Sequence, residues 1–207
     1  MKWIAFSGSD GTGKTTLVKY AYALLSKKHK TKKMHSPYFD WVRDMLWISG
    51  KGKPFGDPVT DNLIFAAGLR CEMYIIQNVE NKYDFLISQR SWLDNFPYRK
   101  VQGFSYDEVI SILEPKDFRA PDAVFFLKTN PKTAMNRIKE QKYGDKYETL
   151  NFIQKSNKEF ENFIDALKKK NIKLNLGRIK IFQLDTNKDL SLVKREIKAI
   201  FKKEKWL

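Results

Sequence analysis

The stretch GSDGTGKTT at residues 8–16 constrains the fold more than any other part of the sequence. It directly follows a short apolar run, and Gly8, Gly13, Lys14 and Thr15 match the spacing G-x-x-x-x-G-K-[ST]. In that pattern a glycine-rich loop joins a strand to a helix, and its backbone N–H groups wrap a phosphate at the positive end of the helix dipole. The sequence therefore predicts a phosphate-binding loop (P-loop, residues 8–15) near the start of an α/β fold.

The rest of the chain alternates short apolar runs with longer amphipathic segments, which is typical of an α/β fold with a mainly parallel sheet. Several of the apolar runs contain almost no polar residue, as expected for strands covered on both faces. Five strands are predicted, at residues 2–6, 32–35, 83–88, 123–127 and 179–184. Helices are predicted at residues 14–28, 41–49, 60–79, 107–113, 131–141, 147–170 and 188–201.

Length and composition favour one globular domain. The 207 residues, 42% of them hydrophobic, are enough for a sizeable core, so we expect a single domain over residues 1–207. No run approaches the ~18 apolar residues that a membrane span needs, and no signal-peptide pattern begins the sequence. The lone cysteine, Cys71, excludes an internal disulfide, and no Cys/His cluster has metal-site spacing. We expect a soluble, cytoplasmic protein in which oxygen atoms bind any metal.

The formal net charge of +15 is compatible with binding to nucleic acid, to a membrane surface or to small polyanions. Lysines cluster at residues 27–33, 168–170 and 202–205, without the interleaved aromatic residues that stack single-stranded bases. We interpret these clusters as solvated surface, where charged residues are commonest.

Several segments carry a family resemblance. FSGSDGTGKTT resembles the start of thymidylate kinases, which usually read F-E-G-x-D-G-x-G-K-T-T. NLIFAAGLR is similar to that family's L-L-F-A-A-D-R, and SQRSWLDNFPYRKVQG to its D-R-Y-x-x-S-x-x-A-Y-Q-G. PDAVFFLKTNPKTAMNRI is similar to P-D-x-x-x-x-L-x-x-x-P-x-x-A-x-x-R-I, DKYE to R-Y-E, and QLDTN to the late D-A turn near adenine. Their order spans nearly the whole chain.

The resemblance implies a P-loop kinase fold, with a five-stranded parallel sheet flanked by helices and a small lid at about residues 139–149. It implies ATP-dependent, Mg²⁺-assisted phosphoryl transfer to a deoxynucleoside monophosphate, most simply dTMP to dTDP. Such a transfer needs positive charge around in-line oxygens and little covalent help. The resemblance also implies a homodimer through the long helices.

Candidate residues for the phosphoryl donor begin in the P-loop. Lys14 would reach the β- and γ-phosphates of ATP, and the Thr15 hydroxyl would bind Mg²⁺. Arg137 matches the family arginine that lies against adenine and the donor phosphates. The full set of expected ATP-binding residues is Ser9, Asp10, Gly11, Thr12, Gly13, Lys14, Thr15, Thr16, Arg137 and Thr186.

For the acceptor nucleotide, Asp10 matches a family acid that lies by the sugar hydroxyl, and Phe65 matches the aromatic residue that stacks on the base. Arg90 matches an arginine that contacts the acceptor or the transferring phosphates, and it follows a predicted strand, where such folds bind ligands. The expected acceptor-binding residues are Asp10, Arg43, Phe65, Arg70, Arg90 and Tyr98, and the expected catalytic residues are Lys14, Arg90 and Arg137.

The chain departs from the family pattern at several positions. Gln89 replaces the acid of the D-R pair, and Asp94 or Asp40 is a candidate to compensate. Leu69 replaces the arginine expected four residues after Phe65, while Arg70 follows about 100° further round the helix.

Further departures concern the phosphate contacts. Gln141 replaces the second lid arginine, so Lys139, Lys142 and Lys146 are candidates to supply charge there. The family's arginine after the second strand has no counterpart beside Pro37, and Arg43 is the nearest candidate.

Two alternative functions remain at this point. SPYFDW and QRS are similar to the E-P-x-x-x-W and E-R-S of deoxynucleoside kinases, which phosphorylate a nucleoside 5'-hydroxyl group. A neutral hydroxyl profits from a general base, but Ser36 and Gln89 replace the acids of both fragments, which favours an anionic nucleotide acceptor.

The other alternative is an ATP-binding P-loop protein that holds nucleic acid on its basic surface. Steeply salt-dependent binding of single-stranded DNA would distinguish that protein from an enzyme.

Overall fold

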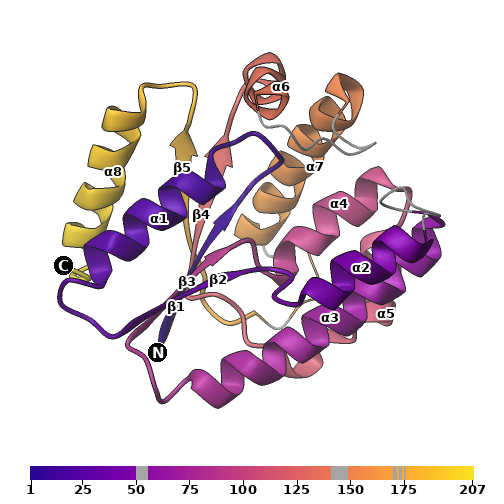
Figure 1. The fold of residues 1–207 in the computed structure, drawn as a ribbon, viewed down its shortest axis with the longest axis horizontal. Coiled ribbons are helices and arrows are strands. Elements are labelled where there is room, and N and C mark those ends of the chain that lie inside the picture. The colour runs from indigo at the N-terminus through magenta and orange to yellow at the C-terminus, as the bar shows by residue number, and fades with distance from the viewer. Residues whose placement is uncertain (50–55, 141–148, 170–171, 173, 175) are drawn as a thin grey trace.

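The computed structural model describes residues 1–49, 56–140, 149–169, 172, 174 and 176–207. Five strands form one sheet in the order β2-β3-β1-β4-β5, and every neighbouring pair is parallel (Figure 1). The strands are β1 (Lys2–Ser7), β2 (Thr31–His35), β3 (Phe85–Gln89), β4 (Ala123–Lys128) and β5 (Lys180–Asp185). All five predicted strands are confirmed, with ends that shift by at most two residues.

Side chains of the central strands alternate between two hydrophobic cores. Trp3 and Phe126 point into one core, whereas Ile4 and Phe125 point into the other. Because both faces of the sheet are covered, the strands read as continuous apolar runs. This explains why they were recognisable from the sequence.

Helices cover both faces of the sheet (Figure 1). Buried residues of α1 and α8 complete one core, and buried residues of α3, α4, α5 and α7 complete the other. The helices in the described part of the chain are α1 (Lys14–Leu25), α2 (Asp40–Ser49), α3 (Pro58–Val79), α4 (Asn95–Val101), α5 (Tyr106–Leu113), α6 (Pro131–Lys139), α7 (Leu150–Lys168) and α8 (Leu190–Lys203). Two 3₁₀ turns accompany them, η1 (Trp92–Asp94) and η2 (Pro115–Asp117).

Capping side chains set several of the helix starts. Asp57 accepts a hydrogen bond from the backbone N–H of Thr60, and Pro58 occupies the first turn of α3. Thr149 caps α7 in the same way, so this helix begins three residues later than the sequence predicted. The helix α4 and both 3₁₀ turns were not predicted, because they are short and α4 carries Pro97 in its first turn.

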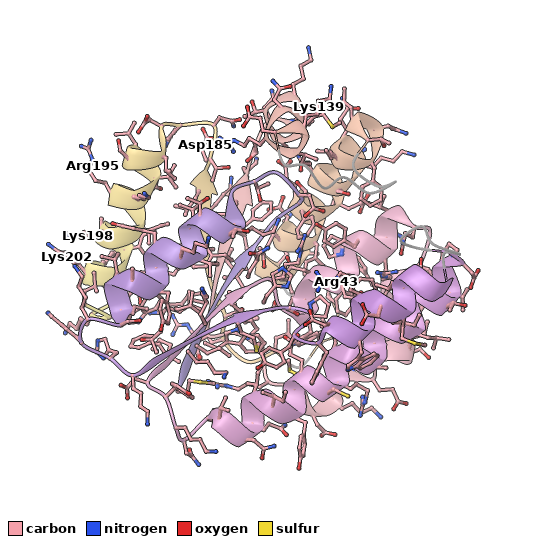
Figure 2. The ribbon with its side chains drawn as sticks, viewed as in Figure 1. Arg43, Lys139, Asp185, Arg195, Lys198 and Lys202 are labelled. Carbon is pink, nitrogen blue, oxygen red and sulfur yellow. The ribbon has the colours of Figure 1, made fainter. Side chains whose placement is uncertain are left out.

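The outer side of α8 is basic. Arg195, Lys198 and Lys202 are exposed and point away from the sheet (Figure 2). Lys202 belongs to the lysine cluster at residues 202–205, and its exposure agrees with the interpretation of that cluster as solvated surface. Within the described residues, no helix combines the length and apolar character needed to cross a membrane.

Candidate active site

The P-loop joins β1 to α1 at the edge of the sheet where the parallel strands end (Figure 1). Gly11 has a φ of 74°, and a Cβ atom there would lie 2.4 Å from the carbonyl oxygen of Ala134 on α6. Gly13, immediately before α1, has a φ of 86°. Glycine adopts such backbone conformations without strain, so the loop can pack tightly and then enter the helix. The first N–H groups of α1 make this point suited to an anion.

Lys14 lies inside the P-loop, and its side chain is only 4% exposed. Its Nζ donates to the carbonyl oxygen of Gly8 at 2.9 Å and to that of Ser9, and it lies 3.8 Å from Asp10 Oδ1. Burial lowers the pKa of Lys14 to about 7, and the positive charge of Arg90 acts in the same direction. The Lys14 side chain can therefore change between its neutral amine form and its ammonium form near neutral pH.

Asp10, Arg90 and Tyr98 form one cluster beside the P-loop. Arg90 pairs with Asp10, and the Tyr98 hydroxyl donates to Asp10 Oδ2 at 3.1 Å. Burial alone would raise the pKa of Asp10, but the charges of Arg90 and Lys14 and the hydrogen bond from Tyr98 hold that pKa below its usual value. Four residues that the sequence predicted for the site thus lie together.

The backbone of Arg90 takes an uncommon conformation, with a φ of 67°. Its N–H donates to the carbonyl oxygen of Phe6 on the neighbouring strand at 2.9 Å. This hydrogen bond ties Arg90 to β1 just before the P-loop, and its guanidinium reaches Asp10 from there.

Arg137 and Thr186 lie at the α6 side of the loop. The Arg137 guanidinium donates to the carbonyl oxygen of Thr186 at 2.8 Å and to that of Gly11 at 3.4 Å. Thr186 follows β5, and its hydroxyl shares a hydrogen bond with Thr129. The two residues expected near adenine are therefore adjacent to each other and to the P-loop.

Other P-loop side chains support the loop itself. The hydroxyl of Ser9 donates to Asn157 on α7, and the hydroxyl of Thr12 donates to the carbonyl oxygen of Ser9 at 2.8 Å. Thr16 is exposed. The sequence did not predict Asn157. Its only sequence signal is that it is a polar residue next to the buried face of α7.

The Thr15 hydroxyl donates to Gln89 Oε1 at 2.8 Å, at an exposed point. Mg²⁺ prefers oxygen ligands, keeps several waters and is bound largely through substrate phosphates in kinases. The hydroxyl of Thr15 and the side-chain oxygen of Gln89 fit that chemistry. Among the described residues, no group of three or more His, Cys, Asp or Glu side chains could hold a metal alone.

The structure separates two of the expected acceptor residues. Phe65 on α3 is half-buried, and the Arg99 guanidinium lies 4.7 Å from the centre of its ring. Arg70 turns away and donates to the carbonyl oxygens of Leu113 at 2.9 Å and Glu114 at 3.0 Å. We therefore leave Arg70 out of the acceptor site. The step of one residue along α3 places it on a different side of that helix.

Sequence reasoning also missed Arg99. The expected arginine was sought on the same helix as Phe65, whereas the arginine found beside its ring comes from α4. Leu69, at the expected position, is 3% exposed in the core. No spacing rule along one helix predicts a contact with another helix.

Arg43 lies near the start of α2 (Figure 2). Its exposed guanidinium pairs with Asp40 at 2.6 Å. His35 ends β2, and burial lowers its pKa to about 4, with further contributions from the positive charges of Arg90, Lys14 and Arg43. These cations therefore act on one region at the end of the sheet. Asp40 is exposed and paired, whereas Asp94, the other candidate acid, is buried.

The predicted lid falls mostly outside the described residues, which omit 141–148. Gln141, Lys142 and Lys146 belong to that stretch. Lys139 is exposed at the end of α6 (Figure 2).

Comparison with known proteins gives a consistent result. Residues 6–197 match the family model described as thymidylate kinase. A thymidylate kinase of Buchnera aphidicola is 27% identical over 209 residues, covering 95% of this chain and 92% of that protein. A probable thymidylate kinase of Pyrobaculum aerophilum is 32% identical over 161 residues, covering 75% of this chain and 79% of that protein. A thymidylate kinase of Onion yellows phytoplasma is 28% identical and covers 98% and 99% of the two chains.

Proposed function

The chain belongs to the thymidylate kinase family, and we propose that it transfers the γ-phosphoryl group of ATP to dTMP, giving ADP and dTDP. The observation that carries this proposal is the convergence of Lys14, Asp10, Arg90 and Tyr98 at one P-loop. Positive charge and positioning are the main requirements of phosphoryl transfer, and this cluster supplies both.

On the donor side, the loop amides and the start of α1 bind the triphosphate. Lys14 exchanges the carbonyl oxygens of Gly8 and Ser9 for phosphate oxygens. Arg137 and Thr186 border the adenine end. Thr15 and Gln89 would hold Mg²⁺, which when bound offsets the negative charge of the phosphates.

On the acceptor side, Phe65 offers a ring for the base, and Asp10 accepts from the sugar hydroxyl. Arg90 and Arg43 face the acceptor phosphate, and Tyr98 orients Asp10 by its hydrogen bond. An acceptor phosphate is already ionised, so no general base is required. Family membership and this lack of a base requirement favour a nucleotide acceptor over a nucleoside.

We also propose a homodimer through α2 and α3. Val59, Leu63 and Tyr74 share one side of α3 and are 51%, 54% and 68% exposed. Trp41 and Met45 on α2 are also exposed apolar residues. Large apolar side chains gathered on adjacent helices favour burial against another subunit. The cytoplasmic location and the closing lid stay predictions from the sequence.

A coupled assay that follows ADP formation with ATP, Mg²⁺ and dTMP tests the proposed reaction. The unchanged chain should turn over, and Lys14→Ala should lower kcat/KM by about a hundredfold or more, because it removes a cation at the phosphates. Arg90→Ala should lower kcat much more than it weakens ATP binding. Unfolding temperatures serve as the control for intact folding. Retained activity in Lys14→Ala, or equal losses of turnover and ATP affinity in Arg90→Ala, would contradict the assigned roles.

A further inference from the structure

A buried hydrogen bond lies at the base of the P-loop. The hydroxyl of Ser7, the last residue of β1, donates to Asp94 Oδ2 of η1 at 2.7 Å. Both residues are 3% exposed. Gly8 follows Ser7 directly, and its carbonyl oxygen accepts from Lys14 at 2.9 Å. The Ser7–Asp94 pair is therefore one residue away from the backbone that holds the P-loop lysine.

The motifs that this sequence resembles carry the opposite residue types at these two positions. F-E-G-x-D-G has a glutamate where this chain has Ser7, and D-R-Y-x-x-S has a serine where this chain has Asp94. In both cases one acid and one hydroxyl stand at this pair of positions. In this chain the acid lies on η1 instead of at the end of β1, and the formal charge of the pair is the same.

Asp94 also has a local role, which accounts for only part of its environment. Its Oδ2 accepts from the Ser91 N–H at 3.1 Å and from the Ser91 hydroxyl at 3.5 Å, which caps η1. Its Oδ1 is buried and has no hydrogen-bond partner among the described residues. Capping alone requires neither the bond to Ser7 nor a full negative charge.

Two cations lie within electrostatic reach of Asp94. Burial and the charge of Arg90 lower the pKa of Lys14, and the negative charge of Asp94 opposes both effects. Burial raises the pKa of Asp94 itself, against the hydrogen bond from Ser7 and the charges of Arg90 and Lys14. Two like charges held close together in a buried site repel each other strongly. A negatively charged acid beneath Lys14 and Arg90 offsets the repulsion between these two cations.

We propose that Asp94 is a positioning residue of the kinase site, supplying from η1 the acid that the family motif places at the end of β1, and fixing the start of the P-loop through Ser7. This inference rests on the proposed function, because the site that it positions is the donor site. It also explains how the chain can lack a glutamate at Ser7.

A double-mutant cycle tests whether the acid of this pair can be moved from position 94 to position 7. Ser7→Glu alone puts two carboxyl groups in buried contact, and Asp94→Ser alone removes both the acid and the acceptor of Ser7. Each should lower the unfolding temperature and should lower kcat and ATP affinity by about tenfold or more. Ser7→Glu combined with Asp94→Ser restores the family arrangement. It should return kcat and ATP affinity to within about threefold of the unchanged chain.

A matched variant separates charge from packing. Ser7→Gln combined with Asp94→Ser has nearly the same shape and hydrogen-bonding capacity as the Ser7→Glu combination, without the negative charge. It should restore the unfolding temperature but not kcat or ATP affinity. Equal rescue of kcat by glutamine and glutamate would show a purely structural pair and overturn the proposal.

The remaining outcomes are also decisive. If Ser7→Glu alone does not fold, the combination with Asp94→Ser supports the proposal when it folds and regains kcat and ATP affinity. A Ser7→Glu, Asp94→Ser combination that is no better than the worse single variant, or that does not fold, overturns it. ATP affinity, measured by calorimetry, does not depend on the acceptor. If the chain fails to phosphorylate dTMP but shows the same rescue of ATP binding, the proposed acceptor is wrong, whereas the proposed ATP site and this inference stand.

Discussion

Four charged residues, Asp10, Lys14, Arg90 and Asp94, interact electrostatically beneath and beside the P-loop, and their formal charges cancel. A triphosphate that enters the loop adds negative charge to this balanced cluster. Lys14 is the member whose pKa lies near neutrality, at about 7. It is therefore the residue whose protonation should respond to the ligand.

ATP binding is predicted to take up a proton at Lys14. The pKa of Lys14 is about 7 in the free protein, and a bound triphosphate favours the ammonium form. ATP affinity should therefore be greatest below pH 7 and should fall as the pH rises above 7, by at most about tenfold per pH unit. Calorimetry at pH 8 in two buffers of different ionisation enthalpy measures the uptake. Lys14→Arg, which stays charged, is the control and should show none. A chain that takes up no proton at pH 8 would refute this assignment.

The positions of candidate site residues were predictable where the motif fixes the local backbone. Glycine spacing alone located Lys14 and Thr15, and the structure places Lys14 within the loop as expected. Arg70 and Arg99 show where prediction from spacing stops. Arg70 caps the end of α5, and Arg99 approaches the ring of Phe65 from α4. Both outcomes depend on packing between helices, which no spacing along the chain encodes.

At the scale of elements, the inner strands β1, β3 and β4 were predictable because burial on both faces gives nearly unbroken apolar runs. The outer strands β2 and β5 contain more polar and exposed residues, so this signal is weaker there. The helix starts followed capping side chains such as Asp57 and Thr149, which decided the first residue of α3 and α7. The missed helix α4 matters most, because it brings Tyr98 and Arg99 to the site. Its seven residues and Pro97 give too short a periodic pattern to recognise.

The contact between the P-loop and α6 is predicted to strengthen ATP binding. In Gly11→Ala the new Cβ would lie 2.4 Å from the carbonyl oxygen of Ala134, at a φ of 74°. The loop must then move away from α6. Because α6 carries Arg137, the KM for ATP should rise by about tenfold or more. Gly177→Ala is the matched control, since Gly177 has a φ of 62° but a Cβ there meets no atom within 4 Å. Steady-state kinetics and unfolding temperatures compare the two variants. An unchanged KM in Gly11→Ala would show that the contact is dispensable.

At the scale of the whole molecule, the exposed apolar side of α3 predicts a dimer that one charge can break. Leu63→Lys would bury an ammonium group in the interface and should give a monomer in sedimentation velocity experiments. Leu192→Lys on α8 is the matched control, because Leu192 is 47% exposed and Leu63 is 54% exposed. It should leave the dimer intact. An unchanged chain that sediments as a monomer, or a Leu63→Lys variant that remains a dimer, would contradict this interface.

The overall architecture was predictable as a parallel sheet with helices on both faces, and the exposed apolar face was not. Periodicity identifies the side of α3 that could be buried, but not which of its apolar residues the rest of the chain covers. Leu69 and Met73 are in the core, whereas Leu63 and Tyr74 on the same helix remain exposed. Only the packed structure distinguishes them.

The most direct test of the central claim is the ranking of acceptors with ATP and Mg²⁺, measured as kcat/KM for a panel of deoxynucleosides and deoxynucleoside monophosphates. An acceptor site built around Arg90 and Arg43, with no general base assigned, predicts that dTMP exceeds thymidine by about a hundredfold or more, because thymidine lacks both the phosphate contacts and an ionised nucleophile. A higher kcat/KM for thymidine than for dTMP would contradict the account.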